Sequence, residues 1–120
     1  MGETRVRITA QALSANGHAP VGIDTLADTG ATLTLLPEAV LKQAGVIPDD
    51  RIPVILADGS RIERSTGHAW LTIEGRRSAC QVIFGEAGDE PLLGLTALEQ
   101  TGFAVDPVQR KLIPSGFKLL

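Results

Sequence analysis

The sequence has few of the residues that build metal sites or disulfide-stabilised folds. Cys80 is the one cysteine among 120 residues, so an internal disulfide is excluded and a zinc site is not expected. Its apolar, strand-like surroundings favour a packed thiol over a reactive one. The two histidines, His18 and His68, are far apart in the sequence and have no ligand pattern beside them. We therefore expect no metal site.

Long hydrophobic runs and an excess of positive charge are also missing. The net charge of −3 argues against nucleic acid or an anionic membrane as a partner. The apolar stretches are too short for a membrane-spanning helix, and the N-terminal residues lack the apolar segment of a secretion signal. The hydrophobic fraction of 43% and the charged fraction of 21% are typical of a globular chain. These features predict a single cytoplasmic domain covering residues 1–120.

Alternating polar and apolar residues dominate the chain. Residues 5–12 alternate without a break, which predicts a strand with one buried face. Asn16-Gly17 is typical of a tight hairpin leading to a second strand over residues 21–26, and Asp58-Gly59 predicts a second turn, of type I′. Further strands are expected at residues 32–36, 52–56, 61–73, 78–84, 92–93, 103–105 and 111–113.

Two short helices interrupt this strand pattern. Pro37-Glu38 predicts a helix start, with Pro37 at the first helical position, and Gly45 predicts its end. Thr96 and Glu99 have the spacing of a capping box, and Gly102 predicts the end of that second helix. The fold class predicted from these patterns is all-β, a small closed barrel with one or two short helices.

The run Leu26-Ala27-Asp28-Thr29-Gly30-Ala31-Thr32-Leu33 is the strongest indication of chemistry. It places one carboxylate between apolar residues, beside a hydroxyl and a glycine. A lone aspartate is a weak base, whereas two adjacent aspartates share a proton. One of the pair can then activate water while the other protonates the leaving group. The chain holds a single copy of the run, so a two-fold symmetric dimer would have to supply the second Asp28.

The neighbours of Asp28 suit this arrangement. Gly30 lets a backbone N–H approach the carboxylate because no side chain intervenes. Thr29 offers a hydroxyl that can tie one loop to its symmetry mate, and the small Ala31 leaves room for a peptide. The nearby Asp24 lacks the glycine that follows Thr29, so we expect it on the surface of a strand.

The segment Asp28-Thr29-Gly30-Ala31 matches the Asp-Thr/Ser-Gly-Ala/Ser/Thr signature of aspartic proteases. The surrounding chain resembles the retropepsins, the single-domain, homodimeric members, over nearly its whole length. In that family a hairpin precedes the catalytic loop, as residues 5–26 do here, and a flap hairpin follows, as residues 55–62 do. Leu92-Leu93-Gly94 then leads into a helix at residues 96–100, again as in the family.

The resemblance implies an aspartic endopeptidase that needs no cofactor. Its catalytic carboxylate would be Asp28, paired with Asp28 of a second copy at the two-fold axis of a homodimer. Thr29 would make the hydrogen bonds between subunits, and Gly30 would orient the pair. An extended peptide or protein substrate would bind by strand addition beneath the flap. The substrate-binding residues that the resemblance implies are Ala31, Ala57, Asp58, Gly59, Ser60 and Arg61.

Residues 56–59 and 91–99 are similar to a prokaryotic branch of the retroviral-like aspartic proteases. Two features differ from the retroviral enzymes. Leu95 stands where they carry an arginine that supports the dimer, and the flap has Gly59 as its one glycine and no aromatic residue at its tip.

Residues 112–120 are apolar for an exposed tail. They are expected to form a sheet between chains with the N-terminus, because an unpaired apolar edge invites aggregation. The alternative is a strand packed on its own domain. Two other functions also remain open at this point, since a fold does not fix an activity. They are a non-catalytic peptide-binding or dimerisation module on the same fold, and a small barrel with an unrelated ligand.

Overall fold

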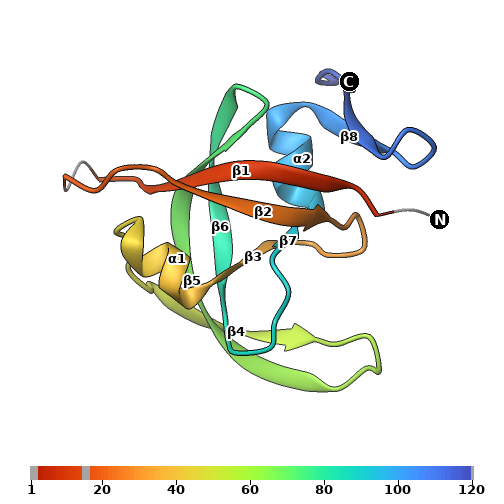
Figure 1. The fold of residues 1–120 in the computed structure, drawn as a ribbon. Coiled ribbons are helices and arrows are strands. Elements are labelled where there is room, and N and C mark those ends of the chain that lie inside the picture. The colour runs from red at the N-terminus through yellow and green to blue at the C-terminus, as the bar shows by residue number, and fades with distance from the viewer. Residues whose placement is uncertain (1–2, 15–16, 120) are drawn as a thin grey trace.

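The computed structural model describes residues 3–14 and 17–119, and strands are its main secondary structure (Figure 1). The elements are β1 (Arg5–Ala12), β2 (Val21–Ala27), β3 (Thr34–Pro37), α1 (Glu38–Gln43), β4 (Asp50–Ile55), β5 (Arg61–Ile73), β6 (Arg76–Gly85), β7 (Leu92–Leu93), α2 (Leu95–Thr101), β8 (Phe103–Asp106) and β9 (Lys111–Pro114). Every expected strand is present, although β3 begins two residues later than expected. The expected turn at Asn16 lies outside the described residues.

Six strands close into a ring in the order β1-β2-β7-β3-β6-β5, and pairing of β1 with β5 completes it. The β2–β7 and β3–β6 pairs are parallel and the others antiparallel. Closure satisfies the backbone hydrogen bonds at the edges that an open sheet would expose. The predicted all-β class and the closed barrel are therefore confirmed.

Two hairpins extend beyond the ring. β4 continues the sheet outward through its pairing with β5, and β8 pairs with β9 in a separate sheet. Figure 1 shows the β4–β5 hairpin extending from the barrel on the side opposite α2 and β8. None of the helices in the described part of the chain is long and apolar enough to cross a membrane.

The core follows from the alternation. One face of β1 is buried along its whole length, whereas β5 is buried mainly in the half that belongs to the ring. The other half of β5 leaves the barrel with β4 and is largely exposed or half-buried. The buried hydrophobic side chains of these two ring segments are Val6, Ile8, Ala10, Ala12, Ala69, Leu71 and Ile73.

The turn between β4 and β5 differs from the expected type I′ turn. Gly59 has a φ of +86°, but Asp58 is not in the left-handed region, which a type I′ turn requires. The N–H of Gly59 donates to the carbonyl of Leu56 at 2.9 Å, and Leu56 donates to Ser60 at 2.8 Å. These bonds describe a three-residue loop that ends in a left-handed glycine.

The type I′ geometry expected for the β4–β5 turn is found instead in the turn between β5 and β6. Glu74 and Gly75 have φ values of 50° and 82°, the paired positive angles of a type I′ turn. The wrong assignment arose because both turns end in an acidic residue followed by glycine. An acidic residue followed by glycine is compatible with both turn geometries. The pairing of the strands sets the number of residues in the loop, and that number decides which turn forms.

The capping box expected from Thr96 and Glu99 is also wrong. α2 begins at Leu95 with Gly94 as its N-cap, so Thr96 lies inside the first turn and no side chain caps the helix. Tertiary contacts described below satisfy the N–H groups of Leu95 and Thr96. At α1, Pro37 is the N-cap and not the first helical residue.

Cys80 is packed, as expected. Its side chain lies on β6 with 3% exposure, and its Sγ is 3.1 Å from Oε1 of Gln100 on α2. Burial raises the pKa of the Cys80 thiol, and a hydrogen bond to Ser78 offsets this only in part.

We predict that native Cys80 reacts slowly with a thiol reagent, because the reactive thiolate is suppressed and access is blocked. Labelling followed by mass spectrometry should be at least about tenfold slower than in the unfolded chain in denaturant, which serves as the control. Equal rates in the two states would contradict the buried position.

Candidate active site

The Asp28 loop, residues 28–33, leaves the end of β2 where that strand lies beside β7. The backbone N–H of Asp28 donates to the carbonyl of Leu93 at 2.9 Å. The N–H of Ala31 donates back to the carbonyl of Asp28 at 3.1 Å and turns the loop on itself. The position of the carboxylate is thus set by a strand that comes much later in the sequence.

The Asp28 carboxylate has the local partner that the sequence predicts. Its Oδ1 accepts a hydrogen bond from the backbone N–H of Gly30 at 2.9 Å. A Cβ at Gly30 would lie 3.2 Å from the same oxygen, so a side chain there would crowd the carboxylate. Asp28 and Ala31 are half-buried, while Thr29 and Gly30 are exposed. The tip of the loop therefore faces solvent, where a second copy could reach it.

Gly94 holds the loop from the opposite side. A Cβ at this position would lie 2.4 Å from the carbonyl carbon of Leu33, so glycine is required for the two backbones to pass. The N–H of Gly94 donates at 3.0 Å to Oγ1 of Thr34, whose side chain is fully buried. A buried donor without a partner is costly, so this hydroxyl completes the crossing.

The start of α2 adds two further bonds to the loop. The N–H of Leu95 donates to the carbonyl of Ala31 at 2.8 Å, and that of Thr96 donates to Thr32 at 3.1 Å. These carbonyls replace the side-chain cap that α2 lacks. The loop and the helix start therefore stabilise each other, and neither is held by its local sequence alone.

A cleft of about 800 Å³ lies between the Asp28 loop and the β4–β5 hairpin. It brings together Asp28, Gly30, Ala31 and Ala57 of the residues that the sequence singled out. Thr29 is at the exposed tip of the loop, outside the lining. The remaining predicted flap residues lie in the turn and at the start of β5, also outside the lining: Asp58, Gly59, Ser60 and Arg61.

The walls of the cleft are apolar, and the sequence analysis did not assign the large side chains that form them to substrate binding. Of the described residues that line it, Asp28 is the one with an ionisable side chain. The continuous apolar run at residues 52–56 was an available signal, since β4 lies outside the barrel ring and these side chains are not part of its core. The apolar side chains of the lining are Leu33, Leu35, Ile52, Val54, Ile55, Leu56, Ile83 and Leu92.

The tip of the hairpin is ordered by Asp58. Its Oδ1 accepts hydrogen bonds from the Ser60 hydroxyl at 2.6 Å and from the Ser60 N–H at 2.9 Å. Both hydrogen bonds lower the pKa of the Asp58 carboxyl, and the bond from the Ser60 hydroxyl has the larger effect. Asp58 therefore serves the turn, and its charge faces solvent.

Within residues 3–14 and 17–119, no three His, Cys, Asp or Glu side chains form a group that could hold a metal ion. His68 instead contacts Asp49, with Nδ1 and Oδ2 2.6 Å apart at the surface. Asp24 is exposed on β2 and pairs with Arg7 at 3.0 Å, as expected for a residue on a strand face.

A closed barrel with an Asp-Thr-Gly loop braced by a strand-glycine-helix junction defines a retropepsin-like aspartic protease domain. The model of one family, described as gag-polyprotein putative aspartyl protease, matches residues 12–100, and the chain belongs to this family. The match includes the Asp28 loop, the β4–β5 hairpin and most of α2. A search of curated proteins gave no match. Membership in the prokaryotic branch stays a prediction.

We predict that Gly94→Ala destabilises the protein by about 3 kcal/mol or more, since the new methyl group would overlap the backbone at Leu33. Urea unfolding measures the change. The matched control is Gly22→Ala on β2, where a Cβ meets the guanidinium of Arg7 at 2.9 Å, a side chain that can move away. Similar losses for the two variants would contradict the tight crossing.

Proposed function

We propose that the protein is an aspartic endopeptidase that works as a homodimer, with Asp28 of each copy forming the catalytic pair. The observation that carries the proposal is a carboxylate in an otherwise non-ionisable cleft, on a loop braced by backbone hydrogen bonds. Membership in the aspartyl protease family supports a peptidase. A rigidly held loop suits a carboxylate that must lie within hydrogen-bond distance of its symmetry-related copy.

Hydrolysis would use the two carboxylates in different protonation states. The ionised Asp28 takes a proton from water as the water oxygen attacks the scissile carbonyl carbon, while the protonated Asp28 donates its proton to the carbonyl oxygen. The resulting diol loses a proton to a carboxylate, the amine nitrogen gains one, and the C–N bond breaks. Because the pair must hold one proton, activity belongs at acidic pH.

The exposed tip of the loop supplies the rest of the proposed site. Thr29 would hydrogen-bond across the two-fold axis, and Gly30 would present its backbone to the substrate. The flap residues Ala57 to Arg61 would close over a bound peptide. The peptide would lie extended, paired through its backbone with the hairpin, and the aliphatic walls favour apolar side chains beside the scissile bond.

The C-terminal region is the proposed dimer contact. Lys111–Pro114 already pairs with β8 of the same chain, so a sheet between chains would add to this hairpin. Phe117 and Leu119 beyond it are 61% and 94% exposed. Arg76 lies 5.7 Å from the Phe117 ring and holds the tail near α2. Exposed apolar side chains on a held segment suit a contact with a second copy.

We predict that Asp28→Asn abolishes peptide cleavage, with a loss of at least about 10³-fold, because the amide cannot accept the proton of water. A peptide library digested at acidic pH and read by mass spectrometry measures the activity. The control is Asp24→Asn, which removes an exposed carboxylate paired with Arg7 on the preceding strand.

An Asp28→Asn variant that cleaves as fast as the parent protein would overturn the proposal. A parent protein that binds peptides but cleaves none, at any pH, would favour the non-catalytic binding module on the same fold.

We predict that activity depends on a dimer. Specific activity should fall on dilution in parallel with dissociation measured by analytical ultracentrifugation. Equal amounts of parent protein and Asp28→Asn, mixed and re-equilibrated, should leave about one quarter of the dimers with two aspartates, and so about one half of the activity that the parent has alone at its own concentration. Activity that is unaffected by the inactive partner would point to a catalytic monomer.

A further inference from the structure

Arg64 is a cation at the base of the β4–β5 hairpin that the proposed reaction does not use. It pairs across the hairpin with Ile52. Residues directly opposite in antiparallel strands point to the same face, and Ile52 lines the cleft. The Arg64 side chain is only 15% exposed. A largely buried guanidinium therefore lies on the cleft-facing side of the hairpin.

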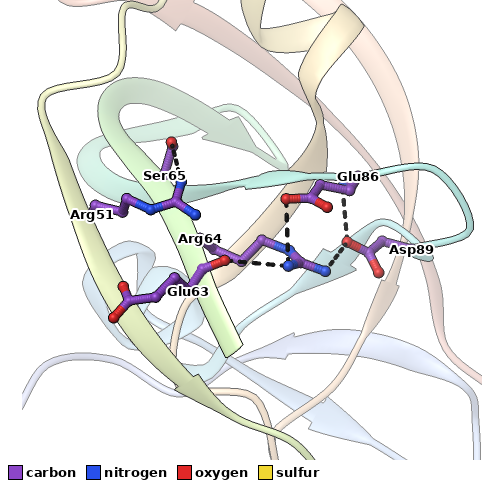
Figure 2. Close-up of polar contacts among 6 residues, drawn as sticks. All are labelled: Arg51, Glu63, Arg64, Ser65, Glu86 and Asp89. Carbon is purple, nitrogen blue, oxygen red and sulfur yellow. Dashed lines mark hydrogen bonds and ion pairs between the residues drawn. The ribbon is translucent and has the colours of Figure 1, made fainter. Parts of the chain in front are cut away.

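Two carboxylates face this guanidinium (Figure 2). Nη1 of Arg64 lies 3.4 Å from Oε2 of Glu86, and Nη2 lies 3.5 Å from Oδ2 of Asp89. Nη1 also donates to the carbonyl of Glu63 at 3.3 Å. The buried Nε has no partner among the described residues. Arg64 thus bridges the hairpin to the loop between β6 and β7.

The loop that receives Arg64 is a closed turn. The N–H of Glu86 donates to Oδ2 of Asp89 at 2.8 Å, and the N–H of Asp89 donates to the carbonyl of Glu86 at 3.0 Å. Asp89 therefore fixes the turn and contacts Arg64 with the same oxygen. Because these hydrogen bonds hold the shape of the turn, a fixed contact between Arg64 and Asp89 also fixes the position of the hairpin relative to β7.

The turn leads directly to the active-site side of the cleft. Leu92, which follows it on β7, lines the cleft, and the carbonyl of Leu93 accepts the N–H of Asp28. A continuous path of bonded groups therefore runs from the hairpin through Arg64 and the turn to the Asp28 loop. Arg64 therefore links the two sides of the cleft.

We propose that Arg64 is a positioning residue that sets the spacing between the β4–β5 hairpin and the β7 side of the cleft, and so the closure of the hairpin over substrate. This inference rests on the proposed function. Stability alone is a poor reason for the arrangement, because burying a charged group carries a desolvation cost that its ion pairs often fail to repay, and one nitrogen of this guanidinium has no partner among the described residues. The planar guanidinium can contact two carboxylates at once, which an ammonium group cannot do in the same geometry.

The consequence for the reaction is a division between binding and chemistry. With the hairpin held in place, an extended peptide binds without first ordering it. Arg64 does not contact the reacting atoms, so its loss should raise KM and leave kcat nearly unchanged. A residue that only stabilised the fold would lower the amount of active enzyme and leave KM unchanged.

The experiment compares Arg64→Met, Arg64→Lys and the control Arg51→Met. Arg51 belongs to the same hairpin, is exposed, and contacts Ser65 at 3.3 Å, apart from the two carboxylates (Figure 2). With a cleaved peptide as substrate, Arg64→Met should raise KM about tenfold with kcat within about twofold. Arg64→Lys, which keeps the charge but loses the fork, should lie between it and the parent, and Arg51→Met should match the parent.

A second measurement is independent of cleavage. Amide hydrogen exchange without peptide should be faster in residues 50–56 and 61–66 of Arg64→Met, while β1 stays as protected as in the parent. If the parent cleaves no peptide, the proposed function fails, and this measurement still decides whether Arg64 holds the hairpin. Unchanged exchange and unchanged KM would overturn the inference, as would exchange that accelerates equally throughout the barrel.

A second variant tests the same contact if Arg64→Met does not fold. Should Arg64→Met be insoluble, Glu86→Gln removes one of the two facing charges at the more exposed end of the cluster. It should produce the same pattern with a smaller amplitude, a KM increase of about threefold and faster exchange confined to the hairpin. A folded Glu86→Gln that behaves as the parent does would overturn the positioning role.

Discussion

The crossing of the Asp28 loop with the β7–α2 junction is the contact on which the rest of the structure depends. The N–H of Asp28 bonds to Leu93, and Gly94 passes the backbone of Leu33 with no room for a side chain. A short loop rich in small and polar residues does not hold one shape by itself. Backbone bonds from a distant strand and helix fix the carboxylate, and they do so without adding a further ionisable side chain to the lining of the cleft.

The cleft places one ionisable side chain among aliphatic residues, and this is why the proposed reaction calls for a second copy of the chain. A carboxylate in such surroundings acts as base or as acid, and hydrolysis of a peptide bond needs both at once. In the proposed homodimer, the two-fold axis would supply the second carboxylate from the same sequence. The β4–β5 hairpin lines the same cleft, and the apolar side chains that it places there are not part of the barrel core.

Local sequence patterns predicted the strands correctly where buried and exposed residues alternate. They failed for the β4–β5 turn and for the N-terminus of α2, where contacts with distant residues decide the geometry. The alternation in β1 and the apolar pair of β7 predicted both strands with their correct bounds. Asp58-Gly59 and Glu74-Gly75 are nearly the same dipeptide, yet they form different turns, because loop length depends on the register of the paired strands. Thr96 and Glu99 have the spacing of a capping box, but the N–H groups of Leu95 and Thr96 donate to carbonyls of the Asp28 loop, and no side chain caps the helix.

The sequence alone determined the all-β class, the position of the Asp-Thr-Gly loop and the approach of the Gly30 N–H to the Asp28 carboxylate, since each depends on residues close together in the chain. Only the tertiary structure decided which side chains face Asp28 across the cleft, and that Arg64 meets Glu86 and Asp89. These contacts join segments far apart in the sequence, and their distances follow from closure of the barrel, a long-range constraint that no local pattern records.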